Sequence, residues 1–115
     1  DKNQYIYRYY SYLINEAYNR RVKVEDIDDV AVAYRTDLGK SNIQFAKTAF
    51  DHIRKACVCY VMIGDFTDFF DNLNHVYLKK QLCDLLSVNR LPDDFYAVYK
   101  NVTHFSYECF LIGTL

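Results

Sequence analysis

The most informative part of the sequence is CVCYVMIGD (residues 57–65), in which seven uncharged residues lead into a glycine and an aspartate. A short run that is apolar on both faces and bounded by glycine is typical of a buried central strand. Asp65 would then stand at the end of that strand, where the chain leaves the core. The sequence therefore predicts a strand over residues 57–63 that ends in a rigidly held carboxylate.

Three aspartates follow this run at intervals of three, and we expect different roles for them. Asp65 suits a Mg²⁺ ion, because sites for phosphate transfer combine one or two carboxylates with substrate phosphates. Asp68 and Asp71 are expected at the start of the next helix, where carboxylates stabilise free amides and the helix dipole. His75 is expected to form structural hydrogen bonds at the same helix start. One carboxylate alone is a weak sign of a metal site.

Helical spacing of apolar residues surrounds the predicted strand. It predicts four helices: 3–20, 41 to about 55, about 75–87, and 92 to about 104. Ser41 and Gln44 have the spacing of a capping box, and Pro92 suits the first turn of a helix. The imperfectly alternating run SYECFLI (residues 106–112) is expected to be a second strand. This order predicts an α+β fold, mostly helical with a few buried strands.

Composition favours one compact domain in a cytoplasmic setting. The chain has 115 residues, of which 51% are hydrophobic, and its net charge is −1. A net charge near zero provides no general attraction to nucleic acid, so such binding would need a local basic patch. No apolar run approaches the roughly 20 residues of a membrane helix, and no signal peptide is evident. No cysteine pair is spaced as CxxC, so Cys57 and Cys59 are expected to be free, buried thiols.

Two segments carry a resemblance to a known family. GDFTDFFDNLNHVYL (residues 64–78) resembles the motif Asp-x-x-x-(Phe/Tyr)-Phe-Asp-x-(Ile/Leu)-x-His-x-x-Leu of bacterial reverse transcriptases of the group II intron and retron type. The matching residues are Asp65, Phe69, Phe70, Asp71, Leu73, His75 and Leu78. Upstream, AYRTDLGKSNIQFA (residues 33–46) is similar to the family's Phe-Arg-x-Gly-(Arg/Lys)-Ser segment. The matching residues there are Tyr34, Arg35, Gly39, Lys40 and Ser41.

The resemblance implies an RNA-directed DNA polymerase that transfers nucleotides with Mg²⁺, using an RNA template, a DNA primer and deoxynucleoside triphosphates. By analogy, Asp65 binds the catalytic ions together with the backbone carbonyl of Phe66. Phe70 would contact the incoming nucleotide as a steric gate against a 2′-hydroxyl, and Phe66 would lie beside it in the nucleotide site. Arg35 and Lys40 are expected near the phosphates of the template or the nucleotide.

The same resemblance implies a fold and a place within it. The chain would be a single fragment of a right-hand polymerase, with fingers-side helices over about 1–56 and the first half of the palm over about 57–115. A truncated palm would expose an apolar sheet edge, through which the fragment could self-associate.

Several features depart from the family pattern. Thr36, Asp37 and Leu38 stand where the family often has a proline and a shorter spacing. The chain contains no Tyr-x-Asp-Asp hairpin, which supplies the other metal-binding carboxylates in the family, and no basic fingers strand. We therefore predict that the chain alone is inactive as a polymerase. Two alternatives remain open: a reverse-transcriptase-like module for RNA binding or assembly without chemistry, and a phage-defence polymerase of the same family.

Overall fold

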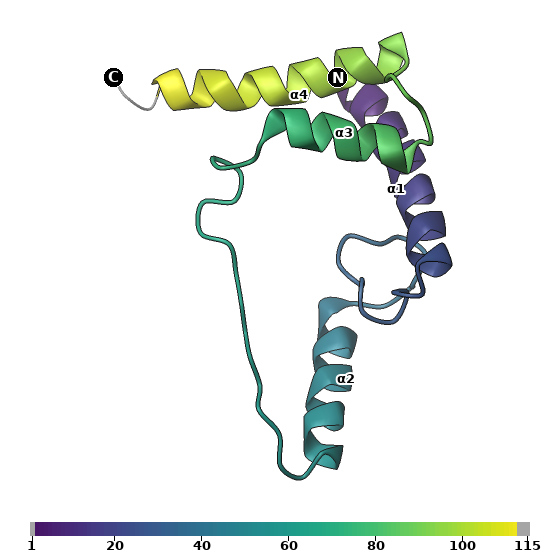
Figure 1. The fold of residues 1–115 in the computed structure, drawn as a ribbon, viewed down its shortest axis with the longest axis vertical. Helices are drawn as coiled ribbons and strands as arrows, with labels where there is room; N and C mark the ends of the chain where they lie inside the picture. The colour runs from purple at the N-terminus through teal and green to yellow at the C-terminus, as the bar shows by residue number, and fades with distance from the viewer. Residues whose placement is uncertain (1, 113–115) are drawn as a thin grey trace.

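The computed structural model describes residues 2–112, with side chains as far as His104. Helices joined by loops make up this part of the chain (Figure 1). The helices are α1 (Lys2–Val24), α2 (Asn42–Lys55), α3 (His75–Leu85) and α4 (Asp93–Ile112). No strand occurs between residues 2 and 112. The predicted α+β fold, a partial right-hand polymerase with a few buried strands, is therefore wrong, and the described part of the chain is all-α.

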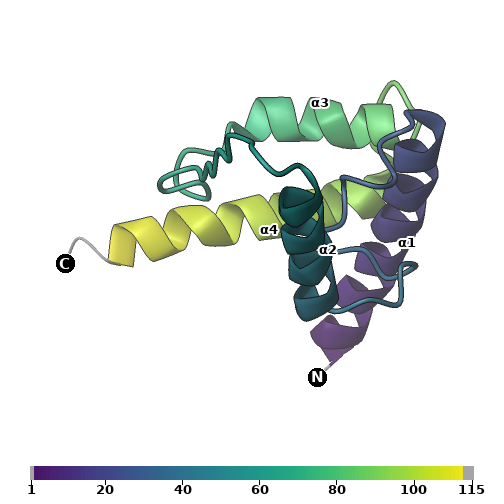
Figure 2. The ribbon, with the colours of Figure 1, turned by 90° about the horizontal axis from the view of Figure 1, so that it is seen from below.

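Three of the helices form a cluster, and the fourth stands apart from it. α3 and α4 both contact α1, whereas long connections carry the chain out to α2 and back (Figures 1 and 2). The radius of gyration is 17.8 Å, compared with about 13 Å for a compact domain of 100 residues. The most buried of the described side chains are Ala17, Asn19, Val22 and Leu91. The chain is therefore more extended than a compact domain of similar length.

Aromatic contacts hold the three-helix cluster together. The Tyr10 ring of α1 packs edge-on against Phe95 of α4, with ring centroids 5.0 Å apart. The Tyr10 hydroxyl donates a hydrogen bond to Asp94 Oδ2 at 2.9 Å, which raises the pKa of Tyr10. Between α4 and α3, the Tyr99 hydroxyl donates to the backbone carbonyl of His75 at 2.6 Å. Burial raises the pKa of Tyr99.

The sequence predicted the helix starts correctly. Ser41 is the N-cap of α2, and its backbone N–H donates to Gln44 Oε1 at 2.7 Å, as the capping box requires. α3 begins at His75 and α4 begins directly after Pro92. α1 continues four residues beyond the predicted end at residue 20, and its last turn contains the basic residues Arg21 and Lys23.

The predicted strand over residues 106–112 is wrong, because these residues continue α4. No glycine or proline interrupts the chain between residues 93 and 112, so nothing in the sequence ends the helix near residue 104. The hydroxyl of Thr103 donates to the backbone carbonyl of Tyr99 at 2.9 Å, within the turn where the helix was expected to end. This short apolar run therefore extends a helix and does not form a strand.

The predicted strand over residues 57–63 is also wrong. These residues belong to an extended connection between α2 and α3, and no segment within residues 2–112 pairs with them as a strand (Figure 1). Tyr60, Met62 and Ile63 are each at least 92% exposed. A strand is stable only when neighbouring strands satisfy its backbone groups and another layer covers its side chains. The described residues supply neither, because the second expected strand is helical.

Candidate functional site

The motif residues lie together in the second half of this connection. Asp65 is exposed, and its Oδ1 accepts a hydrogen bond from the backbone N–H of Phe66 at 2.8 Å. The ring of Phe66 lies 6.2 Å from that of Phe69, which in turn packs edge-on against Phe70 at 5.4 Å. The structure therefore places an exposed carboxylate and three aromatic rings in one exposed segment.

The other two aspartates do not start the next helix. Asp68 lies in a turn with φ +51°, and its backbone carbonyl accepts from the N–H of Asn72 at 3.1 Å. Asp71 lies in the same turn, so the expected helix-start role is wrong for both aspartates. The cap of α3 is Asn74, whose Oδ1 accepts from the N–H of Tyr77 at 2.9 Å. An asparagine directly before a helical apolar pattern was the signal that could have identified it.

The metal-binding capacity of the described residues is incomplete. Among residues 2–112, no group of three His, Cys, Asp or Glu side chains is placed to hold a metal ion. Asp65 and the carbonyl of Phe66 are hard oxygen donors of the type that Mg²⁺ prefers. They could supply two ligands of such an ion, and further carboxylates would have to complete its coordination.

The cysteines next to the motif differ from their prediction. Cys57 and Cys59 are free, as expected, but both are exposed, so their predicted burial is wrong. They are exposed because the strand that was expected to bury them does not form. His75 is the first residue of α3, and its backbone carbonyl accepts the hydrogen bond from Tyr99. That bond does not involve the imidazole, so the expected hydrogen-bonding role of the side chain stays a prediction.

Arg35 holds together the loop that joins α1 to α2. Its side chain is 0% exposed, and its Nη2 lies 2.7 Å from both Asp28 Oδ1 and Asp37 Oδ2. Its Nε donates to Asp37 Oδ1 at 3.0 Å, which makes the Asp37 pair bidentate. Its Nη1 donates to the carbonyls of Asp28 and Ala31 at 3.1 and 3.3 Å. The guanidinium group thus forms all of these contacts with residues of its own loop.

Asp37, one of the residues that depart from the family pattern, is the main partner of Arg35. Hydrogen bonds from Arg35 lower the pKa of Asp37 to about 2, and Lys23 contributes from 3.3 Å. The other predicted phosphate-contacting cation, Lys40, is exposed and follows Gly39, which has φ +59°. No hydrogen bond or ion pair in the described part of the chain joins either cation to Asp65. The arginine–aspartate pair at a spacing of two was the signal for this network.

The depressed pKa of Asp37 predicts how this loop responds to acid. A carboxylate with a lowered pKa in the folded state stabilises the fold above its ordinary value of 3.8, and this contribution is lost as the pH falls through about 2. We expect the carboxyl carbon of Asp37 to titrate near pH 2 by NMR, and to move toward 3.8 in Arg35→Gln. A midpoint near 4 in the unaltered chain would contradict the ion pair.

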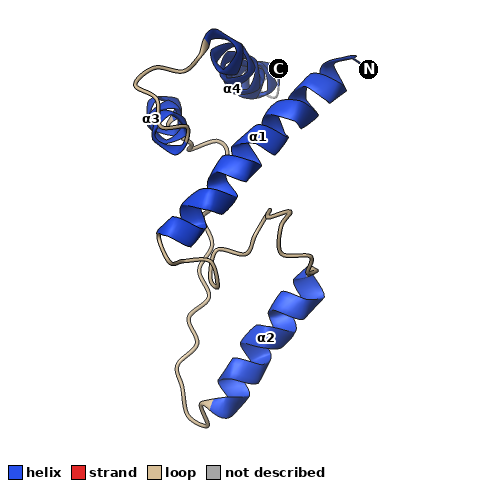
Figure 3. Cartoon of the chain, turned by 90° about the vertical axis from the view of Figure 1, so that its right-hand side faces the viewer, coloured by secondary structure: helices blue, strands red, loops and turns tan. Residues whose placement is uncertain are grey.

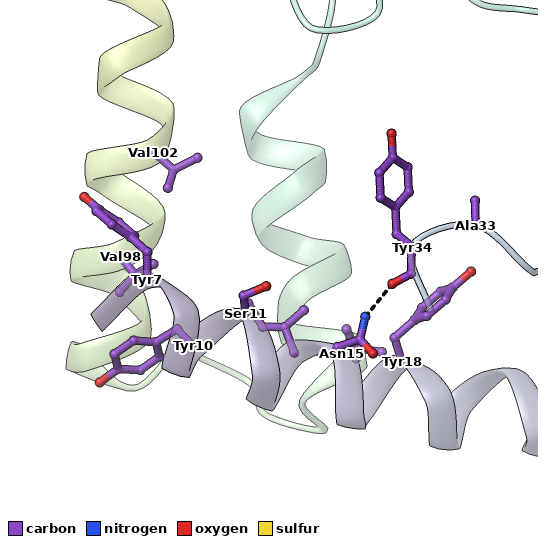
Figure 4. A pocket seen from close by; sticks show the side chains of 11 residues that line it. Tyr7, Tyr10, Ser11, Asn15, Tyr18, Ala33, Tyr34, Val98 and Val102 are labelled. Atoms are coloured by element: carbon purple, nitrogen blue, oxygen red, sulfur yellow. Dashed lines mark hydrogen bonds between the residues drawn. The ribbon is translucent and has the colours of Figure 1, made fainter. Parts of the chain in front are cut away.

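A separate cavity of about 710 Å³ opens between α1, α4 and the loop after α1 (Figure 4). Tyr7, Tyr10 and Tyr18 of α1 line it, together with Tyr34 from the loop. The Asn15 Nδ2 group donates to the carbonyl of Tyr34 at 2.7 Å and ties the loop to the helix. None of the predicted site residues lines this cavity, so it is distinct from the motif segment.

Comparisons with known proteins do not assign the chain to a family. No protein-family model matches it, and no curated protein or solved structure does so either. Among the described residues, no helix has the length and apolar character needed to cross a membrane.

Proposed function

We propose that this chain is part of an RNA-directed DNA polymerase and that Asp65 belongs to its nucleotidyl-transfer site. The observation that carries the proposal is the motif over residues 64–78, with a second family-like segment upstream in the expected order. Seven motif positions agree in register, and they include both the carboxylate and the aromatic residue that the chemistry uses.

The geometry of the exposed segment supports this assignment. Asp65 has no ion-pair partner within residues 2–112, so its charge is available to a ligand. Mg²⁺ bound by Asp65 would supply Lewis-acid stabilisation of the phosphates during nucleotide transfer. The Phe66 and Phe70 rings, each next to Phe69, offer flat apolar surfaces of the kind that pack against a nucleotide.

The test of this proposal is RNA-templated primer extension by the full-length polypeptide that contains this chain. We expect Mg²⁺-dependent incorporation of deoxynucleotides opposite an RNA template. Absence of incorporation by a folded polypeptide that still binds RNA would instead favour a module without chemistry. That alternative has its own support, because the described residues hold one candidate metal carboxylate rather than a cluster.

Phe70 provides a second prediction for the same polypeptide. Phe70→Ala removes the ring that would exclude a 2′-hydroxyl, and we expect incorporation of ribonucleotides relative to deoxynucleotides to rise roughly tenfold or more. Phe69→Ala is the matched control, since it removes the neighbouring ring and should leave sugar discrimination unchanged. Competition between the two nucleotide types on one template measures the ratio. An equal ratio in Phe70→Ala and the unaltered polypeptide would exclude the steric-gate role.

A further inference from the structure

One face of α1 carries exposed tyrosines in a regular row. Tyr5, Tyr9 and Tyr12, which we call the tyrosine stripe, are 73%, 58% and 58% exposed. Their spacing of four and three residues places them on one side of the helix, about 6 and 4.5 Å apart along its axis. The Tyr9 ring meets Tyr10 edge-on, with ring centroids 5.4 Å apart, but more than half of the surface of each stripe residue stays exposed.

Basic residues share the face of the tyrosine stripe. At 3.6 residues per turn, Lys2, Arg8 and Arg20 lie with the stripe within about one third of the helix circumference. Two further basic residues of α1, Arg21 and Lys23, form ion pairs with Glu25 and Asp37. Glu16, the one acidic residue of α1, lies on the face of the stripe, because seven residues are almost two full turns from Tyr9. Arg8 and Arg20 form no ion pair within the described residues. Outside those two ion pairs, the stripe face therefore carries three basic side chains and one carboxylate, a local excess of positive charge in a chain whose net charge is −1.

The stripe points away from the other helices of the cluster. α1 packs against α4 through Tyr10, whose ring meets Phe95, and the buried Ala17 lies on the same side. Figure 3 shows α3 and α4 on one side of α1. Tyr18, nine residues or two and a half turns from Tyr9, lies on the opposite side of the helix from Tyr9 and lines the cavity.

We propose that this face of α1 binds single-stranded nucleic acid. Flat aromatic rings accept stacked bases, while neighbouring arginines and lysines neutralise phosphates. Every base has a face that can stack, so binding of this kind tolerates many sequences. An acidic peptide would match the charge but would leave three exposed rings without a planar partner. The proposal goes beyond the polymerase assignment, because it uses neither Asp65 nor Mg²⁺.

The direct test is fluorescence anisotropy of a labelled 12-nucleotide oligouridylate with the 115-residue chain in buffer containing EDTA. Two to four neutralised phosphates predict a slope of log K against log salt between about −1.4 and −2.8, at about 0.7 per phosphate. Tyr9→Ala should weaken binding roughly tenfold, since stacking is lost. Tyr9→Phe keeps the ring and should bind within about twofold of the unaltered chain.

Two further variants separate stacking and charge from general damage. Tyr18→Ala removes a tyrosine of the same helix from the opposite side and should leave the affinity unchanged. The double variant Arg8→Gln, Arg20→Gln should bring the salt slope closer to zero by about 1.4. Circular dichroism checks that all variants keep the helix content of the unaltered chain.

Three outcomes would overturn the proposal. The first is an equal effect of Tyr9→Ala and Tyr18→Ala on affinity, and the second is salt-dependent binding that no stripe substitution alters. The third is failure of the unaltered, folded chain to bind the oligonucleotide while the stripe mediates association between copies, measured by light scattering. None of these outcomes bears on primer extension, so this proposal and the polymerase proposal can fail separately.

Discussion

Val22→Asp is expected to abolish cooperative unfolding of the cluster formed by α1, α3 and α4. Val22 is 0% exposed and lies near the end of α1, where its backbone carbonyl accepts a hydrogen bond from Ile27 at 3.0 Å. A buried carboxylate without a partner costs several kcal/mol. That cost is comparable with the about 5–15 kcal/mol that stabilises a typical domain. Circular dichroism at 222 nm during heating should show no sigmoidal transition in this variant.

Val24→Asp is the matched control for this experiment. It makes the same substitution in the same helix two residues later, at a side chain that is 84% exposed. Surface substitutions usually change stability by no more than about 0.5 kcal/mol, so its melting temperature should lie within a few degrees of the original. Equal melting temperatures for both variants and the unaltered chain would show that Val22 is not part of a core.

Features that depend on neighbouring residues could be predicted from the sequence. The start of α2 follows from Ser41 and Gln44, because a capping box forms within one turn. The start of α4 follows from Pro92, whose fixed φ suits the first turn of a helix. Apolar spacing located α1 and α3 for the same reason, since helical periodicity requires no distant partner.

Features that depend on distant partners could not be predicted from the sequence. A strand over residues 57–63 required a second strand, and the run expected to supply it forms the last turns of α4. Apolar runs of this length do not distinguish a strand from a buried helix. The exposure of Cys57 and Cys59 follows from that failure rather than from any property of their own.

The candidate site could be predicted from the sequence in part. The motif predicted which residues around Asp65 share a segment, and the structure places the Phe66, Phe69 and Phe70 rings beside one another. The motif did not predict that Arg35 would be buried by carboxylates of its own loop. Such a network depends on how the loop folds back, which the spacing of residues along the chain does not specify.

The second large effect, on the rate of nucleotide incorporation, is expected from a substitution of Asp65. Asp65→Asn keeps the size of the side chain and a carbonyl oxygen that can accept from the N–H of Phe66, but it removes the negative charge. Because this side chain is exposed and forms no ion pair within residues 2–112, folding should not change. Loss of a metal ligand removes several kcal/mol of transition-state stabilisation, and about 4 kcal/mol corresponds to roughly a thousandfold in rate.

Asp68→Asn is the control for charge alone. It removes one negative charge three residues away, from a turn in which the backbone carbonyl of Asp68 forms the hydrogen bond to Asn72. We expect its rate of nucleotide incorporation to stay within about threefold of the original, because an exposed charge outside the coordination sphere acts only through screened electrostatics.

The decisive measurement is single-nucleotide incorporation by the full-length polypeptide on a primed RNA template with Mg²⁺, comparing the unaltered protein, Asp65→Asn and Asp68→Asn. If the assignment of Asp65 to the metal site is right, incorporation falls roughly a thousandfold or more in Asp65→Asn alone. Synthesis by Asp65→Asn at the rate of the unaltered protein would contradict it.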